Sequence, residues 1–306
     1  MESRWIGSLE VSAVGLGGNN FGTRLDYFAT AAVVETALDA GITFFDTADI
    51  YGLGRSEEFL GSILAPHRSR VVIATKFGMD MGGGRKGGSP AYVRRAVEDS
   101  LRRLRTDHID LYQLHRPDPA TPIEQTLGVL DELVRSGKVR EIGCSFFTGP
   151  ELQAAREAAG TGAKFASVQN EYSLLSRAPE QDVLAECEGE GIAFLPYYPL
   201  ASGVLTGKHG RSPAPHTRLA GNADWARRFL TERNLAVTEA LAGFAAAHGH
   251  TLLELAVSWL LSRPAVASVV AGASAPGQVR ANAAAGSWRI APDGLAEIDT
   301  LSEVRA

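Results

Sequence analysis

Eight short β-rich runs alternate with helical patterns along almost the whole chain, and this alternation constrains the fold more than any other sequence feature. Most of the runs are continuously apolar, which is typical of parallel strands buried on both faces. The predicted strands are Ala13–Leu16, Ile42–Phe45, Val71–Thr75, Ile109–Leu114, Val139–Cys144, Ala166–Gln169, Ile192–Tyr197 and Ala267–Val270. Strands joined by helices pair in parallel through right-handed crossovers. Eight units without a break in composition favour a closed α/β barrel, the (β/α)8 or TIM barrel, as a single domain over residues 1–306.

The segments between the strands carry helical periodicity and signals for helix ends. Ser89 and Pro90 are typical of a helix start, and Thr121 and Glu124 have the spacing of a capping box. Gly137 stands where a helix would stop. The predicted helices are Ala29–Ala40, Glu57–Leu64, one from Pro90 through Leu104, one from Thr121 to Gly137, Glu151–Ala159, Pro179–Glu190, Arg233–Ala247, Leu252–Ser262 and Pro276–Ala284.

Two further segments fall outside the repeating pattern. Trp5–Val11 contains a Gly-Ser turn between short β-rich stretches, which predicts an N-terminal β-hairpin that could cap the barrel floor. Ala201–Arg228 combines Gly, Pro and polar residues without a strong period, so it predicts a long loop after the seventh strand. Long loops in compact domains are often functional.

Composition and charge exclude several function classes. The formal net charge is −5, which gives no general attraction to nucleic acid. The arginines of residues 94–105 alternate with acidic residues in a helical pattern, as on a solvated helix face. Cys144 and Cys187 form no CxxC pair, so we expect neither a disulfide framework nor a metal site. Without a signal peptide or a membrane-spanning run, the sequence predicts a cytoplasmic protein with no membrane partner.

A glycine-rich stretch near the start superficially suggests a dinucleotide-binding loop. In Gly15-Leu16-Gly17-Gly18-Asn19-Asn20 the third glycine of a GxGxxG motif is missing, and Asn20 holds its place. A tight turn at the end of the first strand is the simpler interpretation.

Polar side chains follow three neighbouring strands at the points where these strands end. Asp46 ends the second strand with Tyr51 just beyond it, Lys76 ends the third, and His115 ends the fourth. In barrel enzymes the chemistry lies at the carboxyl ends of the strands. Since adjacent strand ends converge in a closed barrel, we expect the four side chains to share one mouth.

This arrangement resembles the aldo-keto reductase superfamily over nearly the whole chain. The matching segments, in order, are GITFFDTADIYGLGRSEEFLG, VVIATKFG, IDLYQLHRPD, REIGCSFF, VQNEYSLL, PYYPLASGVLTGK and VVAGASAPGQVRAN. The resemblance implies hydride transfer between a nicotinamide dinucleotide and a carbonyl carbon, with Tyr51 as general acid. Lys76 would lower the Tyr51 pKa, Asp46 would hold Lys76, and His115 would orient the substrate oxygen.

The resemblance also implies cofactor contacts around the rest of the mouth. Tyr197 would stack on the nicotinamide, Ser145 and Gln169 would bind its carboxamide, and Asp46 would reach its ribose. Contacts to the phosphates and adenosine would come from Leu200, Ser202, Gly203, Leu205, Lys208, Gly272, Ser274, Gln278 and Asn282. The implied cofactor is NADPH, with NAD as the alternative.

Two departures from the family pattern concern these contacts. Phe146 stands where the family often has Asn, and Asn170 is the candidate replacement for that carboxamide contact. The segment 272–275 lacks the cation that usually reads the ribose phosphate. Arg280 is the nearest candidate for that cation.

Two other function classes stay open, as does the substrate. One is a cofactor-binding regulatory subunit of the potassium-channel β-subunit type, and the other is a barrel lyase with Lys76 as Schiff-base nucleophile. The expected partner is a small carbonyl compound, the direction of the reaction is open, and the expected assembly is a monomer or weak homo-oligomer. Candidate residues for the substrate pocket are Phe21, Tyr27, Phe77, Arg116, Phe146 and Trp225.

Overall fold

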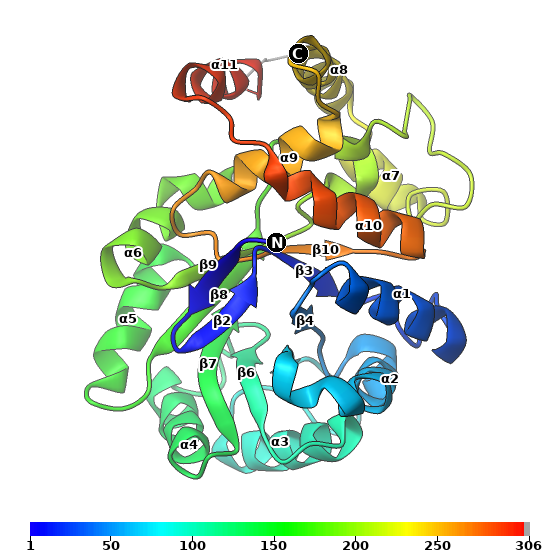
Figure 1. Ribbon diagram of the computed structural model, residues 1–306. Coiled ribbons are helices and arrows are strands. Elements are labelled where there is room, and N and C mark those ends of the chain that lie inside the picture. The colour runs from blue at the N-terminus through cyan, green and yellow to red at the C-terminus, as the bar shows by residue number, and fades with distance from the viewer. Residues whose placement is uncertain (303–306) are drawn as a thin grey trace.

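Eight parallel strands curl into a barrel in the computed structural model, which describes residues 1–302 (Figure 1). The strands are β3 (Val14–Gly17), β4 (Phe44–Asp46), β5 (Val72–Phe77), β6 (Ile109–Leu114), β7 (Val139–Ser145), β8 (Phe165–Glu171), β9 (Ala193–Tyr197) and β10 (Val269–Gly272). They follow the order β10-β3-β4-β5-β6-β7-β8-β9. At the seam, Phe194 N donates to Ala265 O at 2.7 Å, and Ala267 N donates to Phe194 O at 3.0 Å. The predicted barrel is confirmed, because all eight predicted strands are present with ends shifted by no more than two residues.

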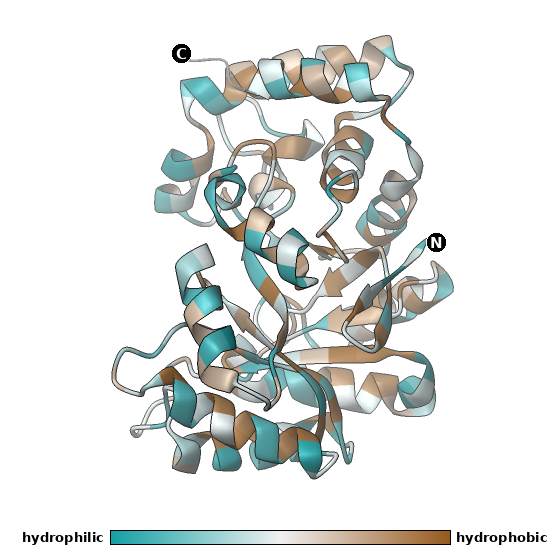
Figure 2. Cartoon of the chain, turned by 90° about the vertical axis from the view of Figure 1, so that its left-hand side faces the viewer, coloured by the Kyte–Doolittle hydropathy of each residue, from teal (hydrophilic) through white to brown (hydrophobic). Residues whose placement is uncertain are grey.

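Helices cover the outside of the barrel. They are α1 (Tyr27–Asp39), α2 (Arg55–Leu64), α3 (Pro90–Leu104), α4 (Ile123–Arg135), α5 (Gly149–Ala159), α6 (Val183–Glu190), α7 (Ala223–Phe229), α8 (Glu232–Ala247), α9 (Leu252–Leu261), α10 (Pro276–Ala284) and α11 (Pro292–Ser302). In Figure 2 the apolar colour follows the strands, whereas the helices carry both colours. This pattern is expected where each helix buries one stripe against a sheet that is buried on both faces.

The helix ends correct one sequence prediction. The expected capping box at Thr121 and Glu124 is wrong, because Pro122 is the N-cap of α4 and makes no side-chain cap bond. Thr121 Oγ1 donates to Asp118 Oδ2 instead, at 2.8 Å. Capping boxes form at the starts of α5 and α9, where Thr148 pairs with Glu151 and Thr251 pairs with Glu254.

The N-terminal hairpin closes the end of the barrel where the strands begin. Its strands β1 (Ser3–Ile6) and β2 (Leu9–Ser12) pair antiparallel, and Ile6, Leu9 and Val11 pack in one buried cluster with barrel residues. The turn is fixed by Ser8 N, which donates to Glu141 Oε1 at 2.8 Å. The predicted position on the barrel floor is therefore confirmed, and the opposite end is left for the mouth.

The segment after β9 is less irregular than the sequence suggests. It contains the short 3-10 helix η4 (Ala201–Thr206) and helix α7, neither of which was predicted. Helix α11, near the C-terminus, was also missed. The remaining 3-10 helices are η1 (Tyr51–Gly54), η2 (Ala65–Arg70), η3 (Ala178–Gln181) and η5 (Ala285–Ser287).

Within residues 1–302 no single helix has the length and apolar character needed to cross a bilayer. Helices α8 and α9 meet that requirement only as a pair, across a bend of 92°.

Candidate active site

A buried ion pair lies at the ends of β4 and β5. Lys76 Nζ donates to Asp46 Oδ1 at 2.8 Å and Oδ2 at 2.7 Å, and to the Thr47 carbonyl at 2.9 Å. Lys76 is 0 % exposed and Asp46 is 3 % exposed. All three ammonium hydrogens are therefore used. Burial lowers the pKa of Lys76, and the Asp46 carboxylate opposes that shift.

The turn that follows β4 brings Tyr51 in front of this pair. Tyr51 N donates to the Ala48 carbonyl at 3.1 Å, and Lys76 Nζ lies 5.4 Å from the centroid of the Tyr51 ring. Gly52, at φ +60°, is left-handed, and an added Cβ there would lie 3.0 Å from the Gly22 carbonyl oxygen. The turn therefore needs glycine at this position, because both the backbone conformation and the close approach disfavour a side chain.

Helix α2, which follows this turn, is anchored by a buried carboxylate. Glu57 is 0 % exposed. It accepts from Thr75 Oγ1 on β5 at 2.6 Å and from Arg103 Nε on α3 at 2.6 Å. Arg103 thus departs from the predicted solvated face, although Arg94, Arg95, Arg102 and Arg105 are exposed as predicted. The anchor fixes the start of α2 and, through it, the turn that carries Tyr51.

The environment of Tyr51 keeps its phenol protonated. Burial raises the pKa of Tyr51 above its usual range, the negative charge of Asp46 raises it further, and the Arg218 guanidinium opposes them. The net lowering of this pKa that was expected from Lys76 is not found, because burial outweighs the nearby positive charge, and the Lys76 hydrogens point to Asp46 and Thr47. Tyr51 is thus a proton donor rather than a ready phenolate.

His115 completes the group at the end of β6. Its ring packs edge-on to Tyr51, with 5.9 Å between the centroids. Burial lowers the pKa of His115 to about 3, and the nearby charges of Lys76 and Arg116 lower it further. Its Nδ1 atom is buried without a hydrogen-bond partner. His115 is therefore a neutral imidazole at ordinary pH. The four side chains expected at one mouth do gather there.

A cavity of about 620 Å³ opens over these residues. Most of the site residues expected from the sequence line it: Asp46, Tyr51, His115, Ser145, Gln169, Tyr197, Leu200, Ser202, Gly203, Lys208, Gly272, Ser274, Gln278 and Asn282. Lys76 and Leu205 are fully buried behind the wall, and Arg280 is exposed on α10 outside the lining. Among the substrate-pocket candidates, Arg116, Phe146 and Trp225 line the cavity, whereas Phe21 and Phe77 are core residues. Tyr27 packs against Phe59 outside it.

One wall of the cavity carries amides and hydroxyls in a fixed network. Gln169 Nε2 donates to Asp46 Oδ1 at 3.0 Å, and Ser145 Oγ donates to the Gln169 carbonyl at 2.5 Å. Asn170 accepts from Phe146 N at 2.7 Å and donates to the Phe147 carbonyl at 2.7 Å. Asn170 is held by these two backbone bonds and is not among the residues that line the cavity, so it is not placed to replace the missing carboxamide contact.

The segment after β9 forms a second wall with unusual backbone geometry. Ala201, Ser202 and Gly203 have φ of +46°, +56° and +95°. Successive residues in turn conformations can aim backbone N–H groups at one anion. The Ser202 hydroxyl is buried without a partner, and a Cβ on Gly203 would lie 2.6 Å from Lys208 Cε. This wall fits an anionic ligand, and the left-handed backbone at residue 203 favours glycine.

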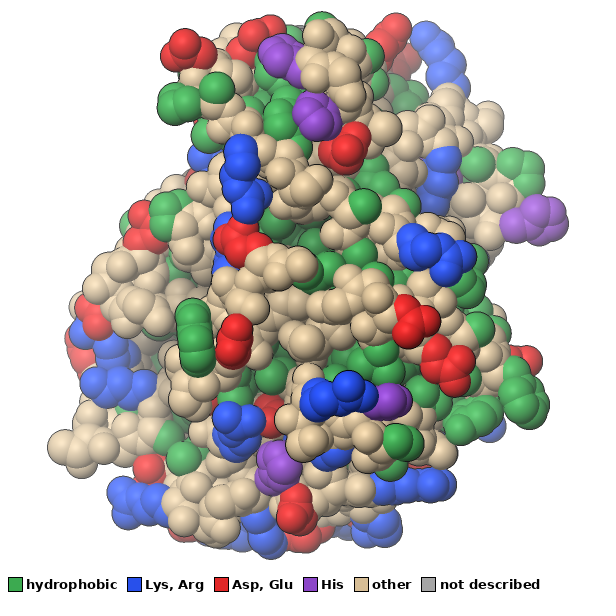
Figure 3. Space-filling view, in the orientation of Figure 1, with side chains coloured by type: hydrophobic (Ala, Val, Ile, Leu, Met, Phe, Trp, Pro, Cys, Tyr) green, Lys and Arg blue, Asp and Glu red, His purple; other side chains and the backbone are tan. Residues whose placement is uncertain are grey.

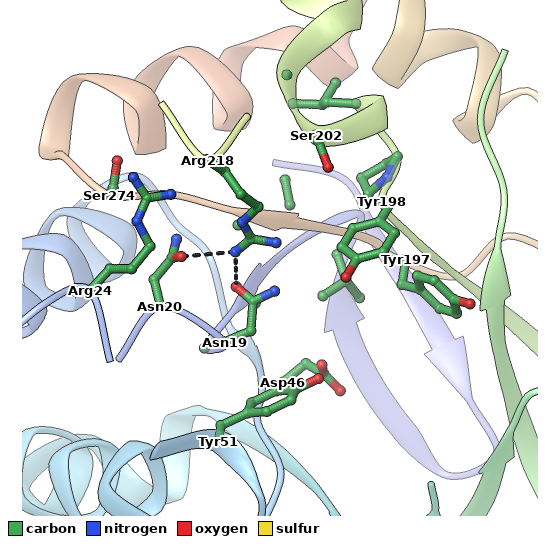
Figure 4. A pocket seen from close by; sticks show the side chains of 18 of the residues that line it. Asn19, Asn20, Arg24, Asp46, Tyr51, Tyr197, Tyr198, Ser202, Arg218 and Ser274 are labelled. Atoms are coloured by element: carbon green, nitrogen blue, oxygen red, sulfur yellow. Dashed lines mark hydrogen bonds between the residues drawn. The ribbon is translucent and has the colours of Figure 1, made fainter. Parts of the chain in front are cut away.

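Three cations line the cavity near β3 and β10. They are Arg24, Lys208 and Arg218, and no carboxylate of residues 1–302 lies within ion-pair distance of them. Arg218 donates to Asn19 Oδ1 at 3.0 Å and Asn20 Oδ1 at 2.9 Å, which ties the long loop to the β3–α1 loop (Figure 4). Arg24 and Ser274 line the same cavity (Figure 4).

This concentration of charge sets the cavity apart from the outer surface. On the face drawn in Figure 3, Lys and Arg side chains are interspersed with Asp and Glu side chains. Inside the cavity, Asp46 is the one carboxylate among the lining residues of the described chain, and Lys76 neutralises it. The sequence analysis missed Arg24 and Arg218, because no motif marks them and only the folded loops bring them to the mouth.

The chain is similar to known proteins over nearly its full length. The model of the Aldo/keto reductase family matches residues 13–303. The chain is 33% identical to aldo-keto reductase YhdN of Bacillus subtilis, covering 96% of this chain and 91% of that one. It is 33% identical to a probable voltage-gated potassium channel subunit beta of Oryza sativa, covering 86% and 83%. The solved glycerol dehydrogenase AKR11B4 of Gluconobacter oxydans superposes with a TM-score of 0.86 at 31% identity, covering 98% and 94%.

Proposed function

The chain belongs to the aldo/keto reductase family, and we propose that it is a single-domain enzyme that reduces aldehydes or ketones with NADPH, with Tyr51 as the general acid. The family as a whole supports an oxidoreductase that uses a nicotinamide cofactor. The observation that carries the finer proposal is the lining of one cavity. A proton donor and a neutral imidazole line it together with three cations that have no carboxylate partner among the described residues.

In this proposal the protein donates a proton to the substrate carbonyl and orients the carbonyl oxygen. When bound, the reduced nicotinamide supplies a hydride, which forms the new C–H bond at the carbonyl carbon. The Tyr51 hydroxyl gives its proton to the carbonyl oxygen, so that the products are an alcohol and the oxidised nicotinamide. His115, neutral because burial lowers its pKa to about 3, donates a hydrogen bond to the same oxygen.

The Asp46–Lys76 pair acts behind the tyrosine. Its ammonium lies 5.4 Å from the Tyr51 ring centroid, where its positive charge stabilises the negative charge that develops on the phenol oxygen as the proton leaves. Asp46 holds the ammonium in place through both carboxylate oxygens, at 2.8 Å and 2.7 Å. In the reverse direction, alcohol oxidation, the same groups would take up the proton.

The cofactor contacts expected from the sequence fit this cavity with few changes. Tyr197 is half-buried at the end of β9 and offers a ring for stacking, and Ser145 and Gln169 offer polar atoms for a carboxamide. Ser202, Gly203 and Lys208 fit a pyrophosphate. The remaining predicted contacts, at the end of β10 and on α10, fit the adenosine: Gly272, Ser274, Gln278 and Asn282.

The choice of NADPH over NADH rests on Arg24. The segment 272–275 has no cation, and Arg280 lies outside the lining. Arg24, from the β3–α1 loop, lines the same cavity as Ser274 and is a cation without a carboxylate partner among the described residues (Figure 4). A guanidinium suits a phosphate ester on the adenosine ribose, because its planar donors can bind two phosphate oxygens at once.

The rival proposals fit the site less well. A Schiff-base lyase needs an accessible, neutral amine, whereas Lys76 is 0 % exposed and donates all three hydrogens. A channel subunit, as one relative is named, would bind the cofactor without needing turnover. Catalysis by the purified protein decides between that role and an enzyme.

The test is a cofactor-oxidation screen of the purified protein with aldehydes, ketones and sugars, run with NADPH and with NADH. We expect absorbance of the reduced cofactor to fall in the presence of at least one carbonyl class, with a higher kcat/KM for NADPH. Tight binding of both cofactors without turnover of any carbonyl would favour the regulatory subunit instead.

A further inference from the structure

One cation of the cavity has no task in the proposed function. Arg116 directly follows His115, lines the cavity and is exposed. No carboxylate of residues 1–302 lies within ion-pair distance of it, and its guanidinium makes no hydrogen bond to a described residue. An unpaired arginine beside a proposed acid–base centre is available to a ligand.

This guanidinium lies over an aromatic ring. Its central carbon lies 4.2 Å from the centroid of Phe146. Phe146 is 37 % exposed and has φ +64°, and its backbone N–H is held by Asn170 Oδ1 at 2.7 Å. Stacking uses the face of a guanidinium and leaves the donors on its edge free, and these donors match a carboxylate or phosphate in fork geometry.

The barrel order separates Arg116 from the cations assigned to the cofactor. Arg116 follows β6, which lies four strands from β10 in either direction around the barrel. Arg24 follows β3, the neighbour of β10. The phosphates of a dinucleotide at the β3–β10 side would therefore leave Arg116 unneutralised.

Aromatic rings lead away from this cation across the cavity. Phe146 and Tyr197 pack with 5.2 Å between their ring centroids, and Tyr197 and Tyr198 pack with 5.1 Å between theirs, whereas Trp225 lies on the side of Arg218, whose guanidinium carbon is 5.7 Å from its ring centroid. A substrate in this space would meet apolar groups along its carbon skeleton and one positive charge at the mouth. Such a combination of an apolar wall with one convergent charged group fixes a ligand's orientation.

We propose that the substrate is a carbonyl compound that also carries an anionic group, and that Arg116 binds this group while His115 and Tyr51 bind the carbonyl oxygen. The proposal rests on the proposed function of the same site. Its chemistry is shared by carboxylates and phosphate esters, and both classes present paired oxygens to the guanidinium edge. Arg116 is then the residue that distinguishes charged from neutral carbonyl substrates.

The test compares probes of similar shape and different charge. These are 4-carboxybenzaldehyde, its neutral isostere 4-formylbenzamide, and 4-formylphenyl phosphate, each reduced with saturating NADPH. For the wild-type protein we expect a higher kcat/KM with an anionic probe than with the amide. Arg116→Met should lower this preference roughly tenfold to a hundredfold, mainly through KM, because a hydrogen-bonded charge pair is lost. The anionic probe whose kcat/KM falls more in Arg116→Met identifies whether the anionic group is a carboxylate or a phosphate ester.

Two further variants control the comparison. Arg116→Lys keeps the charge without the fork, so part of the preference should remain. Arg135→Met removes the same charge from the outer surface of α4, where its side chain is 73% exposed and paired with Asp131, and the wild-type preference should be unchanged. If Arg135→Met lost the preference for anionic probes as much as Arg116→Met, the preference would reflect the net charge of the protein. That result would overturn the proposal.

The result that overturns the inference differs from the one that overturns the proposed function. Equal preference in wild type and Arg116→Met, with the amide still reduced, would remove Arg116 from substrate recognition and leave the reductase intact. Failure of the wild-type protein to reduce any of the probes, or any carbonyl in the wider screen, would contradict both.

Discussion

Individual side chains at the site are set for proton donation rather than proton abstraction. Burial and Asp46 raise the pKa of Tyr51, and burial lowers that of His115 to about 3. At pH values between the pKa of His115 and that of Tyr51, the phenol keeps its proton and the imidazole stays neutral. The pair can thus give two hydrogen bonds to one oxygen over the whole physiological pH range, which suits carbonyl reduction.

At the residue scale, replacing Arg24 tests whether this side chain binds the ribose phosphate of NADPH. We expect Arg24→Met to raise the Kd for NADPH by roughly tenfold with a much smaller change for NADH, because only NADPH carries the extra phosphate. Arg280→Met is the matched control, since Arg280 is an exposed cation on α10 outside the cavity. Fluorescence titration with both cofactors provides the measurement. A larger effect from Arg280 than from Arg24 would reverse the assignment.

A second buried acid near the site makes folding stability depend on pH. Asp49 is 2 % exposed and accepts weakly from Tyr92, with 3.4 Å between the oxygens. Burial and the nearby Glu57 raise the pKa of Asp49 to about 7. Between pH 4 and pH 7 the folded chain holds this proton and the unfolded chain does not, so this group makes stability fall as pH rises. His115 acts oppositely below pH 6.5, because only the unfolded chain then gains its proton.

The substitution Asp49→Asn isolates the effect of Asp49 on the pH dependence of stability. It should remove up to about 3 kcal/mol of the pH-dependent loss of stability between pH 5 and pH 8, because the folded chain holds the extra proton only up to about pH 7. Chemical denaturation at both pH values gives the free energy of unfolding. Asp39→Asn, at an exposed position on α1, should leave the pH difference as in wild type. An unchanged pH difference in Asp49→Asn would show that Asp49 is ionised alike in both states.

At the scale of elements, the position of Tyr51 depends on how α2 is held. Glu57 joins α2 to β5 through Thr75 and to α3 through Arg103. Gly61 makes the contact between α2 and α3 possible, because a Cβ there would lie 2.5 Å from the Leu104 carbonyl carbon. Two helices and a strand therefore fix the turn that carries the proton donor.

Removal of Arg103 tests this anchor. Arg103→Met leaves the Glu57 carboxylate buried without its cation, which should lower the free energy of unfolding by about 3 kcal/mol. Arg102→Met, on the adjacent residue, removes an arginine whose side chain is 69% exposed, so the change should stay within about 0.5 kcal/mol. Urea denaturation of both variants makes the comparison. Equal small effects would mean that Glu57 is held without Arg103.

The sequence predicted the elements that have strong local signals and missed those without them. The strands are continuous apolar runs between Gly, Pro and polar residues, so their pattern identified them. Helix α7 is a seven-residue helix inside a polar loop, and α11 contains Gly294. The Thr121–Glu124 spacing misled because Pro122 takes an extended ψ of +135° and becomes the cap itself.

The site residues likewise separate into those that a sequence pattern could predict and those that it could not. Asp46, Tyr51, Lys76 and His115 were predictable because strand ends of a barrel must converge. Arg24, Arg103 and Arg218 were not. The partners of Arg103 and Arg218 lie far away in the sequence, and no local pattern shows that Arg24 reaches the cavity without a carboxylate partner. The direction of the Tyr51 pKa shift was also missed, since it depends on burial that only the packed structure supplies.

At the scale of the whole molecule, the residues that close the barrel and the residues that form the site lie at opposite ends of it. The hairpin β1–β2 fills the end where the strands begin, and Ile6, Leu9 and Val11 are at most 1 % exposed there. The opposite end carries the cavity, whose walls come from the ends of β3, β4, β5, β6, β7, β9 and β10 with the loops that follow them, and from Gln169 within β8. The central claim is that these loops assemble one site in which Tyr51 donates the proton and the cations hold the cofactor.

Replacing Tyr51 with phenylalanine tests this claim most directly, with NADPH binding and carbonyl reduction measured on the same preparation. The variant should bind NADPH with a Kd close to that of wild type, because the phosphate-binding residues are untouched. Its rate of reduction should fall by roughly a hundredfold to ten-thousandfold, the range for loss of a general acid. Reduction at the wild-type rate by the variant would contradict the account.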